Sequence, residues 1–188
     1  MDDAHIELLG LKADSLQGDS VISKIMENFD VESKFTTNGV LLVKTISRND
    51  LQKKWENKRF EFDFADCPDL AQTVVAFCSI LKIKGLFKGL ESLRIKETDR
   101  IAALQNEIRK LGMDLFEKEG VFELKPIDFT ENKSPISIDT YDDHRMAMAF
   151  APLACIKDLE IENPNVVQKS YPKFWEDLKS VGFQIDEQ

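Results

Sequence analysis

The chain has few of the residues on which disulfide frameworks and metal sites depend. Its three cysteines, Cys67, Cys78 and Cys155, are odd in number and share no CxxC spacing, and its only histidines are His5 and His144. Disulfide-stapled proteins and zinc sites need more cysteine, or cysteine and histidine at closer spacing. We therefore expect neither a disulfide framework nor a metal centre, and we expect the cysteines to be small buried hydrophobes.

Long apolar runs and an excess of positive charge are also missing. No apolar run approaches the roughly 18 residues that span a bilayer, and the start, Met1-Asp2-Asp3-Ala4-His5, is acidic where a signal peptide is basic. The formal net charge is −9, whereas surfaces for nucleic acid or anionic membranes need clustered Lys and Arg. These absences predict a cytoplasmic protein that binds neither, and an anionic ligand would need a local basic pocket.

No linker or low-complexity tract divides the chain. Two kinds of helical pattern recur along it. In the first kind the apolar residues form one stripe, which predicts a surface helix with one face inward. These stretches are residues 21–29, 100–111 and 173–181. The second kind is apolar almost all round, as is typical of buried helices. These stretches are residues 70–81 and 145–156.

Stretches of alternating apolar and polar residues lie between the helical patterns and predict strands. They are residues 6–9, 41–45, 60–64, 121–125, 136–140 and 159–162. The alternation looks like an internal repeat of about 70 to 80 residues, so we expect one α/β (α+β) unit used about three times. Such a repeat would bring the helix starts to one end of the domain, where unpaired N–H groups and partial positive charge favour an anion.

Two polar segments open helices and carry the residues of most chemical interest. Arg94-Ile95-Lys96-Glu97-Thr98-Asp99-Arg100 packs three cations and two carboxylates into seven residues. A structural interpretation is a capping segment, with Thr98 or Asp99 as the cap; the functional one is that Lys96 and Arg100 hold anionic groups while Glu97 works between them. Asp142-Asp143-His144-Arg145 is likewise explained by an ordinary N-cap and a solvated arginine. Neither segment is decisive alone.

Five segments taken together resemble the family of 5-enolpyruvylshikimate-3-phosphate synthase (EPSP synthase), an enolpyruvyl transferase. The family's Lys-Glu-Thr-Asp-Arg motif stands intact at residues 96–100, and its Asp-His-Arg-Met-Ala-Met motif at residues 143–148. Three shorter segments match in order and approximate spacing. They are Gln17-Gly18-Asp19, Pro68-Asp69-Leu70-Ala71 and Lys169-Ser170-Tyr171-Pro172. The resemblance covers nearly the whole chain.

The resemblance implies a fold of repeated βαβαββ units, with buried parallel helices inside and four-stranded sheets outside. Family members have two similar domains that close around the substrates, and residues 1–188 resemble the carboxy-terminal domain alone. We therefore expect the amino-terminal domain to be absent and the isolated chain to have little or no transferase activity. The family is usually monomeric, and one strand of this domain comes from the extreme amino terminus, so we expect an open sheet edge or a missing strand.

The implied activity is transfer of the enolpyruvyl group of phosphoenolpyruvate to the 5-hydroxyl of shikimate 3-phosphate, with release of phosphate. This is a step of the shikimate pathway of aromatic amino acid biosynthesis. The reaction is an addition followed by an elimination. It needs a base for the hydroxyl, an acid for the methylene carbon, and cations for carboxylate and phosphate, with no metal or organic cofactor.

The resemblance also implies roles for individual residues. Asp69, Glu97 and Lys169 match the catalytic positions, and the division of acid and base roles among them stays open. Arg100, Arg145 and Lys169 match the cations that bind phosphoenolpyruvate. Asp69 and Lys96 match residues that contact the shikimate substrate, and Ser92 stands where the family has an asparagine or a similar small polar residue.

Two alternative functions compete with this interpretation. UDP-N-acetylglucosamine enolpyruvyl transferase shares the fold and the chemistry but lacks the two intact motifs. A non-catalytic module of the same fold would have no need for all five of Asp69, Glu97, Arg100, Arg145 and Lys169. Both alternatives are therefore weaker than an EPSP synthase-like domain.

Overall fold

The computed structural model describes residues 5–130 and 135–186 of the chain. It falls into two compact units, Met1–Phe60 and Glu61–Gln188. Residues 1–4, which make up most of the acidic start considered above, lie outside the described residues. Among the helices that are described, none is both long and apolar enough to cross a membrane.

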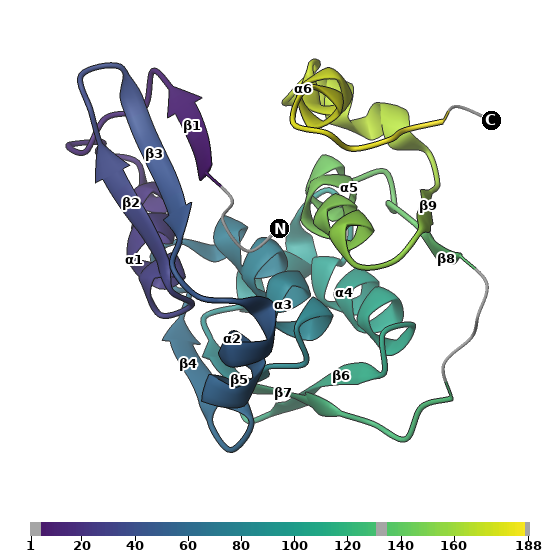
Figure 1. Ribbon diagram of the computed structural model, residues 1–188. Coiled ribbons are helices and arrows are strands. Elements are labelled where there is room, and N and C mark those ends of the chain that lie inside the picture. Colours follow the sequence, from purple (N-terminus) through teal and green to yellow (C-terminus); the bar gives the residue numbers. More distant parts are fainter. Residues whose placement is uncertain (1–4, 131–134, 187–188) are drawn as a thin grey trace. The chain divides into compact units, whose positions relative to one another are not determined.

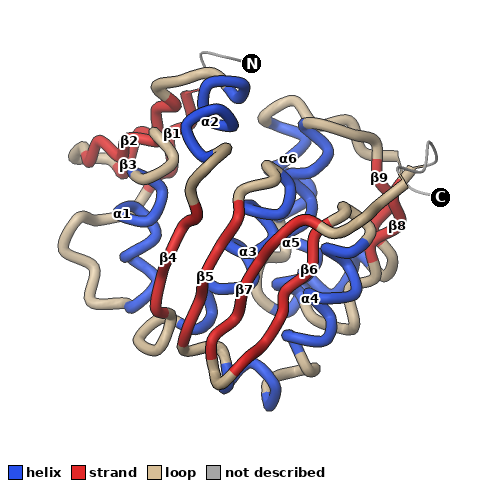
Figure 2. The backbone as a smooth tube through the Cα atoms, turned by 90° about the horizontal axis from the view of Figure 1, so that it is seen from below, coloured by secondary structure: helices blue, strands red, loops and turns tan. Residues whose placement is uncertain are grey.

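One complete βαβαββ repeat forms a sheet and a layer of helices, most of it in the second unit. Its elements are β4 (Arg59–Asp63), α3 (Ala71–Ile80), β5 (Lys84–Lys88), α4 (Arg100–Arg109), β6 (Met113–Lys118) and β7 (Val121–Pro126). The sheet order is β4-β5-β7-β6, and β7 is antiparallel to both β5 and β6. Figure 2 shows this sheet covering one side of α3 and α4. The sheet is therefore the outer layer and the helices are the inner one.

The two helices of this repeat behave as their patterns predict. α3 is buried on nearly every side, whereas α4 buries one stripe together with two charged residues, Arg100 and Glu107. Asp99 caps α4, because its Oδ1 accepts hydrogen bonds of 3.0 and 3.1 Å from two backbone N–H groups of the first turn. Gly112 follows the last turn with a φ of +71°, the left-handed conformation in which helices commonly end.

A partial repeat with the order βαβα follows in the second unit. Its elements are β8 (Ile136–Ile138), α5 (His144–Phe150), β9 (Leu159–Ile161) and α6 (Phe174–Ser180), and β8 runs parallel to β9. α5 is mostly buried and lies beside α3, with α6 on its far side (Figure 1). Phe174 and Trp175 of α6 pack against a small core made by Ala147, Val166 and Val167. α5 is thus covered by α3 on one side and by α6, which buries no residue of its own, on the other.

Short 3-10 helices complete the second unit and lead into its longer helices. They are η2 (Pro68–Leu70), η3 (Glu91–Ile95), η4 (Ala151–Cys155) and η5 (Pro164–Lys169). η2 runs directly into α3, and η3 stands a few residues before α4. The polar segments singled out in the sequence therefore lie in the connections that enter α3, α4 and α5.

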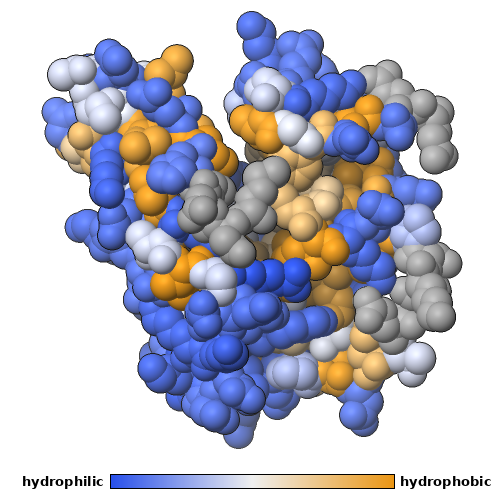
Figure 3. Space-filling model, viewed as in Figure 1, coloured by the Kyte–Doolittle hydropathy of each residue, from blue (hydrophilic) through white to orange (hydrophobic). Residues whose placement is uncertain are grey.

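The first unit corresponds to the last four elements of a repeat, with an added helix. Its elements are β1 (His5–Leu9), the 3-10 helix η1 (Gly18–Val21), α1 (Ile22–Glu27), β2 (Val31–Phe35), β3 (Gly39–Lys44) and α2 (Arg48–Trp55). Its strand order β1-β3-β2 is antiparallel throughout and matches the order β5-β7-β6. Phe29 packs against Phe60 and Trp55, with ring centroids 4.8 and 5.5 Å apart. Ile6 and Leu9 are exposed, and apolar surface is visible over this sheet in Figure 3.

These observations confirm the repeat and correct its extent. In the part of the chain that the structure describes, only the sheet β4-β5-β7-β6 has the expected four strands. The first sheet has three strands and the last has two, because the flanking repeats are incomplete, with the orders βαββ and βαβα. The two predicted helix types are confirmed: α1, α4 and α6 take one place in the repeat, and α3 and α5 take the other.

Three predictions at the level of single elements need correction. The helix expected at residues 145–156 ends at Phe150 and continues as η4, because Pro152 has no N–H to donate to the preceding turn. Cys155 is exposed, whereas Cys67 and Cys78 are buried as expected. Four elements, α2, β2, β5 and β6, were not predicted.

Candidate functional site

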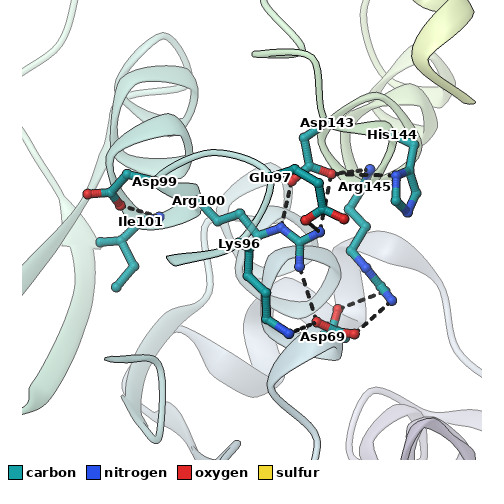
Figure 4. A network of polar contacts seen from close by, with 9 residues as sticks. All are labelled: Asp69, Lys96, Glu97, Asp99, Arg100, Ile101, Asp143, His144 and Arg145. Carbon is teal, nitrogen blue, oxygen red and sulfur yellow. Dashed lines mark hydrogen bonds and ion pairs between the residues drawn. The ribbon is translucent and has the colours of Figure 1, made fainter. Parts of the chain in front are cut away.

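The starts of three helices converge on one network of charged side chains in the second unit (Figure 4). Asp69, in η2 at the entry to α3, forms ion pairs with three cations. Its Oδ1 lies 3.2 Å from Lys96 Nζ and 3.1 Å from Arg100 Nη1, and its Oδ2 lies 3.0 Å from Arg145 Nη2. Arg145 Nη1 also donates to the Asp69 backbone carbonyl at 3.1 Å. Asp69 therefore links the starts of α3, α4 and α5.

Arg100 is the buried centre of the network. It is the first residue of α4, and its side chain is only 2% exposed. Its Nε donates to Asp143 Oδ2 at 2.6 Å and its Nη2 donates to Glu97 Oε2 at 2.6 Å, while a longer 3.4 Å bond joins Nη2 to Asp143 Oδ1. Together with Asp69, three carboxylates thus surround one guanidinium, whose planar arrangement of donors suits carboxylate groups.

Asp143 joins this centre to α5. Its side chain is fully buried, and its Oδ1 accepts a hydrogen bond of 2.8 Å from the backbone N–H of Arg145, so it is the N-cap of the helix. The neighbouring His144 is also buried, and its Nδ1 has no hydrogen-bond partner among the described residues. The α5 start therefore contributes a buried carboxylate, a buried imidazole and a half-buried guanidinium to the site.

The formal charges of the network cancel, since three carboxylates meet three cations. The members are Asp69, Glu97, Asp143, Lys96, Arg100 and Arg145. Asp143 is inaccessible, whereas the side chains of Asp69 and Glu97 are 33% and 43% exposed. The carboxylates around the arginines therefore differ in access to solvent: those of Asp69 and Glu97 reach the surface, and that of Asp143 does not.

Two of the groups have shifted pKa values. Burial works to raise the pKa of the Asp69 carboxyl, but Arg145, Lys96 and Arg100 outweigh burial and hold the pKa below its ordinary value of 3.8. Burial lowers the pKa of the His144 ring below 6.5; Asp143 opposes this change and Arg145 adds to it. At neutral pH the network therefore holds an ionised Asp69, and the His144 ring next to Asp143 is uncharged.

Comparisons with known proteins show which family this chain resembles. The family profile described as EPSP synthase (3-phosphoshikimate 1-carboxyvinyltransferase) matches residues 1–178. A 3-phosphoshikimate 1-carboxyvinyltransferase of Bacteroides fragilis is 43% identical over 183 residues, which are 97% of this chain and 43% of that protein. The protein of the same name from Clostridium kluyveri is 34% identical over 184 residues, which are 97% and 40% of the two chains.

The chain belongs to the EPSP synthase family. Its fold is also that of a solved EPSP synthase from Acinetobacter baumannii, with a TM-score of 0.61 at 20% sequence identity over 99% of this chain and 43% of that one. The enolpyruvyl transferase fold expected from the sequence is thereby confirmed. The chain spans about two fifths of the length of the curated relatives that it matches.

The structure brings together five of the seven residues that the resemblance to EPSP synthases marked as site residues. They are Asp69, Lys96, Glu97, Arg100 and Arg145. Ser92 lies on η3 and is exposed, and Lys169 is the exposed last residue of η5. Neither takes part in the network within the residues that the structure describes. Their expected roles stay predictions.

Sequence reasoning missed the central position of Asp143. Its place before a buried helix predicted a cap, and the structure confirms the cap, but the same carboxylate also binds Arg100. The available signal was the pair Asp142-Asp143, since one carboxylate is enough to cap a helix. In residues 5–130 and 135–186, no group of three or more His, Cys, Asp or Glu side chains is arranged to hold a metal ion.

Proposed function

We propose that this chain supplies one half of an EPSP synthase active site, which transfers the enolpyruvyl group of phosphoenolpyruvate to the 5-hydroxyl of shikimate 3-phosphate. The observation that carries the proposal is the convergence of Asp69, Lys96, Glu97, Arg100 and Arg145 from three helix starts. These residues occupy matching positions of the family motifs. A role limited to capping would leave the contacts among the three segments without a purpose.

The two arginines are suited to bind phosphoenolpyruvate. Each presents a planar set of donors that fits a carboxylate or a phosphate, and each now contacts an exposed carboxylate of the protein that a ligand can replace. Lys96, a mobile point charge beside Asp69, is placed to contact the phosphorylated acceptor. We assign phosphoenolpyruvate to Arg100 and Arg145, and shikimate 3-phosphate to Lys96 and Asp69.

The remaining residues provide proton transfer for an addition and an elimination. In the addition, the acceptor hydroxyl loses a proton to a base, its oxygen bonds to C2 of phosphoenolpyruvate, and the methylene carbon gains a proton. In the elimination, that carbon loses a proton and the bond from C2 to the phosphate oxygen breaks. Asp69, ionised at neutral pH, is suited to be the base. Glu97, exposed at the edge of the network, is suited to exchange the proton of the methylene carbon.

A second, amino-terminal half completes the site in this proposal, and residues 1–188 form the carboxy-terminal domain. The relatives are more than twice as long as the part that this chain matches. Among the described residues two of the three sheets have fewer than four strands, which supports the same proposal, because a second half could supply further strands. A monomeric state and a cytoplasmic location stay predictions.

The test is release of phosphate by a joined protein. This chain replaces the matching 183 residues of the Bacteroides fragilis relative, and phosphate is measured with phosphoenolpyruvate and shikimate 3-phosphate. Activity is expected, and R145K should reduce it about 100-fold, because lysine keeps the charge but loses the planar fork. R109K is the matched control, since Arg109 is half exposed and pairs with Asp114 at the far end of α4.

Other outcomes separate the alternatives. Phosphate release with UDP-N-acetylglucosamine in place of shikimate 3-phosphate would favour the related sugar-nucleotide enzyme. A joined protein that folds, as judged by circular dichroism, but releases no phosphate with either acceptor would favour a non-catalytic module.

A further inference from the structure

We propose that Asp143 is a positioning residue that holds both arginines of the site in their working orientations through one buried carboxylate. The proposal deepens the proposed function and rests on it only for the identity of the ligand. Asp143 is fully buried, so it cannot touch a substrate in this arrangement. Its influence has to pass through Arg100 and Arg145.

Asp143 fixes the side chain of Arg100 from the inner side. Oδ2 accepts from Nε at 2.6 Å and Oδ1 from Nη2 at 3.4 Å, so the carboxylate takes one edge of the guanidinium. The other edge is left to the partly exposed Asp69 and Glu97. A free arginine side chain samples many rotamers, and a buried charge-assisted fork removes that freedom before any ligand arrives.

The same carboxylate fixes the backbone that carries Arg145. Asp143 Oδ1 accepts the Arg145 N–H at 2.8 Å and sets the first turn of α5. From that turn the Arg145 side chain reaches both the carboxylate and the backbone carbonyl of Asp69. A movement of Asp143 would therefore displace both guanidinium groups.

The loop before Asp143 is held in an unusual conformation that sets the direction of its side chain. Tyr141 and Asp142 both have positive φ values, 52° and 56°, which cost conformational energy in residues other than glycine. Glu107 of α4 holds this loop, because its carboxylate accepts the Tyr141 hydroxyl at 2.8 Å and the Asp139 backbone N–H at 3.3 Å. α4 thus binds the loop two turns away from Arg100, which fixes the distance between Arg100 and Asp143.

The substitutions that test the proposal separate the contact of Asp143 with the Arg100 guanidinium from its contact with the Arg145 backbone N–H. D143S keeps an oxygen that can cap α5 but is too short to reach Arg100. D143N keeps the cap and the shape but removes the charge. D114S is the matched control, since Asp114 is a buried aspartate whose partner Arg109 lies at the other end of α4.

The first measurement uses no ligand. In ¹H–¹⁵N spectra of the 188-residue chain, the Nε–H of Arg100 should give a slowly exchanging signal, which R100K assigns by its disappearance. D143S should abolish the slow exchange and D143N should shift the signal, while D114S leaves it unchanged. A slowly exchanging, unshifted Arg100 signal in folded D143S would overturn the proposal.

The second measurement adds phosphoenolpyruvate to the same proteins. D143S should raise the Kd about 10- to 100-fold, the effect expected for loss of one charge-assisted hydrogen bond, and D114S should leave it unchanged. An equal rise in D114S would mean a general loss of stability and would overturn the positioning role. If the unchanged chain and the joined protein both fail to bind phosphoenolpyruvate, the proposed function fails, while the ligand-free spectra still decide whether Asp143 positions Arg100.

Discussion

Arg100 is a buried member of the charged network, and its guanidinium contacts three carboxylates. Its guanidinium is removed from water, and the cost of this desolvation is offset by three carboxylates. The net gain in stability from a buried ion pair is small, but loss of the arginine would leave the buried Asp143 carboxylate uncompensated. The residue is therefore hard to replace, whatever its catalytic role.

Arg100→Met should lower the free energy of unfolding by about 3 kcal/mol or more, because Asp143 would remain buried without its cation. Urea unfolding followed by circular dichroism measures the change. Arg94→Met is the control, since Arg94 is 41% exposed and pairs with Glu117 and Asp99 near the surface. Its loss should cost less than about 1 kcal/mol. Equal losses in the two variants would contradict the buried-pair argument.

His144 should titrate below pH 6.5 in the folded chain, because burial disfavours its charged form. Between the folded and the unfolded pKa the unfolded chain binds more protons, so stability should rise as pH rises through this window. Histidine ¹H–¹³C spectra measure the titration, and H144Q assigns the signal, as the chain has only two histidines. In H144Q this part of the pH dependence should vanish; its persistence would assign the effect to another group.

Most members of the charged network were predictable from the sequence, but their pairing was not. Helix-start positions and motifs pointed to Asp69, Glu97, Arg100 and Arg145, and these residues do meet. The bond between Arg100 and Asp143 joins positions 43 residues apart, and no helical or strand periodicity reports a contact at that separation. Only the tertiary fold could reveal that the buried carboxylate of Asp143 binds Arg100.

At the scale of elements, the hydrophobic pattern predicted those parts of the repeat that bury a clear face. The missed helix α2 is a charged segment that buries only Leu51, and it stands outside the repeat. The missed strand β2 has no buried residue, and β6 ends in an exposed charged stretch. Neither strand shows the regular alternation of apolar and polar residues by which a strand is recognised in a sequence. Pairing with a neighbouring strand stabilises them instead, β2 with β3 and β6 with β7.

Gly112 at the end of α4 tests how closely the helix end is packed. An added Cβ would lie 2.9 Å from the Phe129 side chain, in addition to the strain at φ +71°. G112A should therefore lower the free energy of unfolding by about 2 kcal/mol, and G120A by about 1 kcal/mol. Gly120 has a similar φ of +74°, and its Cβ would meet only the flexible end of Glu91 at 3.1 Å. Urea unfolding compares the two, and an equal loss would show that Phe129 moves aside freely.

The loop that precedes α5 depends on the hydroxyl of Tyr141. Y141F should lower the free energy of unfolding by about 1 to 3 kcal/mol, because the fully buried Glu107 would lose a hydrogen-bond donor. Y171F is the natural control, since the other tyrosine donates to Asp177 at the surface, and it should change stability by less than about 0.5 kcal/mol. Thermal or urea unfolding measures both. If Y141F were as stable as the unmodified chain, the hydrogen bond from Tyr141 to Glu107 would not stabilise the loop.

At the scale of the whole molecule, the charged network lies entirely within the second compact unit. Asp69 to Arg145 are all contained in Glu61–Gln188. The chain nevertheless spans only about two fifths of its relatives. This chain should therefore be able to bind a small anion without being able to turn over two substrates.

The isolated chain should bind phosphoenolpyruvate weakly but show little or no turnover. Enclosure and orientation of two reactants need the surfaces of both halves in the proposed enzyme. Spectra of the arginine Nε–H groups report binding, and phosphate release with both substrates reports turnover, with the full Bacteroides fragilis relative as the positive control. Near-normal turnover by the 188-residue chain would contradict the requirement for a second half.

The buried pair of Arg100 and Asp143 also has an evolutionary consequence. Substitution of Arg100 first produces a protein in which the buried Asp143 carboxylate has lost its arginine, whereas substitution of Asp143 leaves Arg100 only its partly exposed partners Asp69 and Glu97. A lineage can leave this arrangement only by exchanging both residues or by acquiring spare stability beforehand. Substitutions at the two positions are thus expected to be correlated: relatives that lack the arginine should also lack the aspartate.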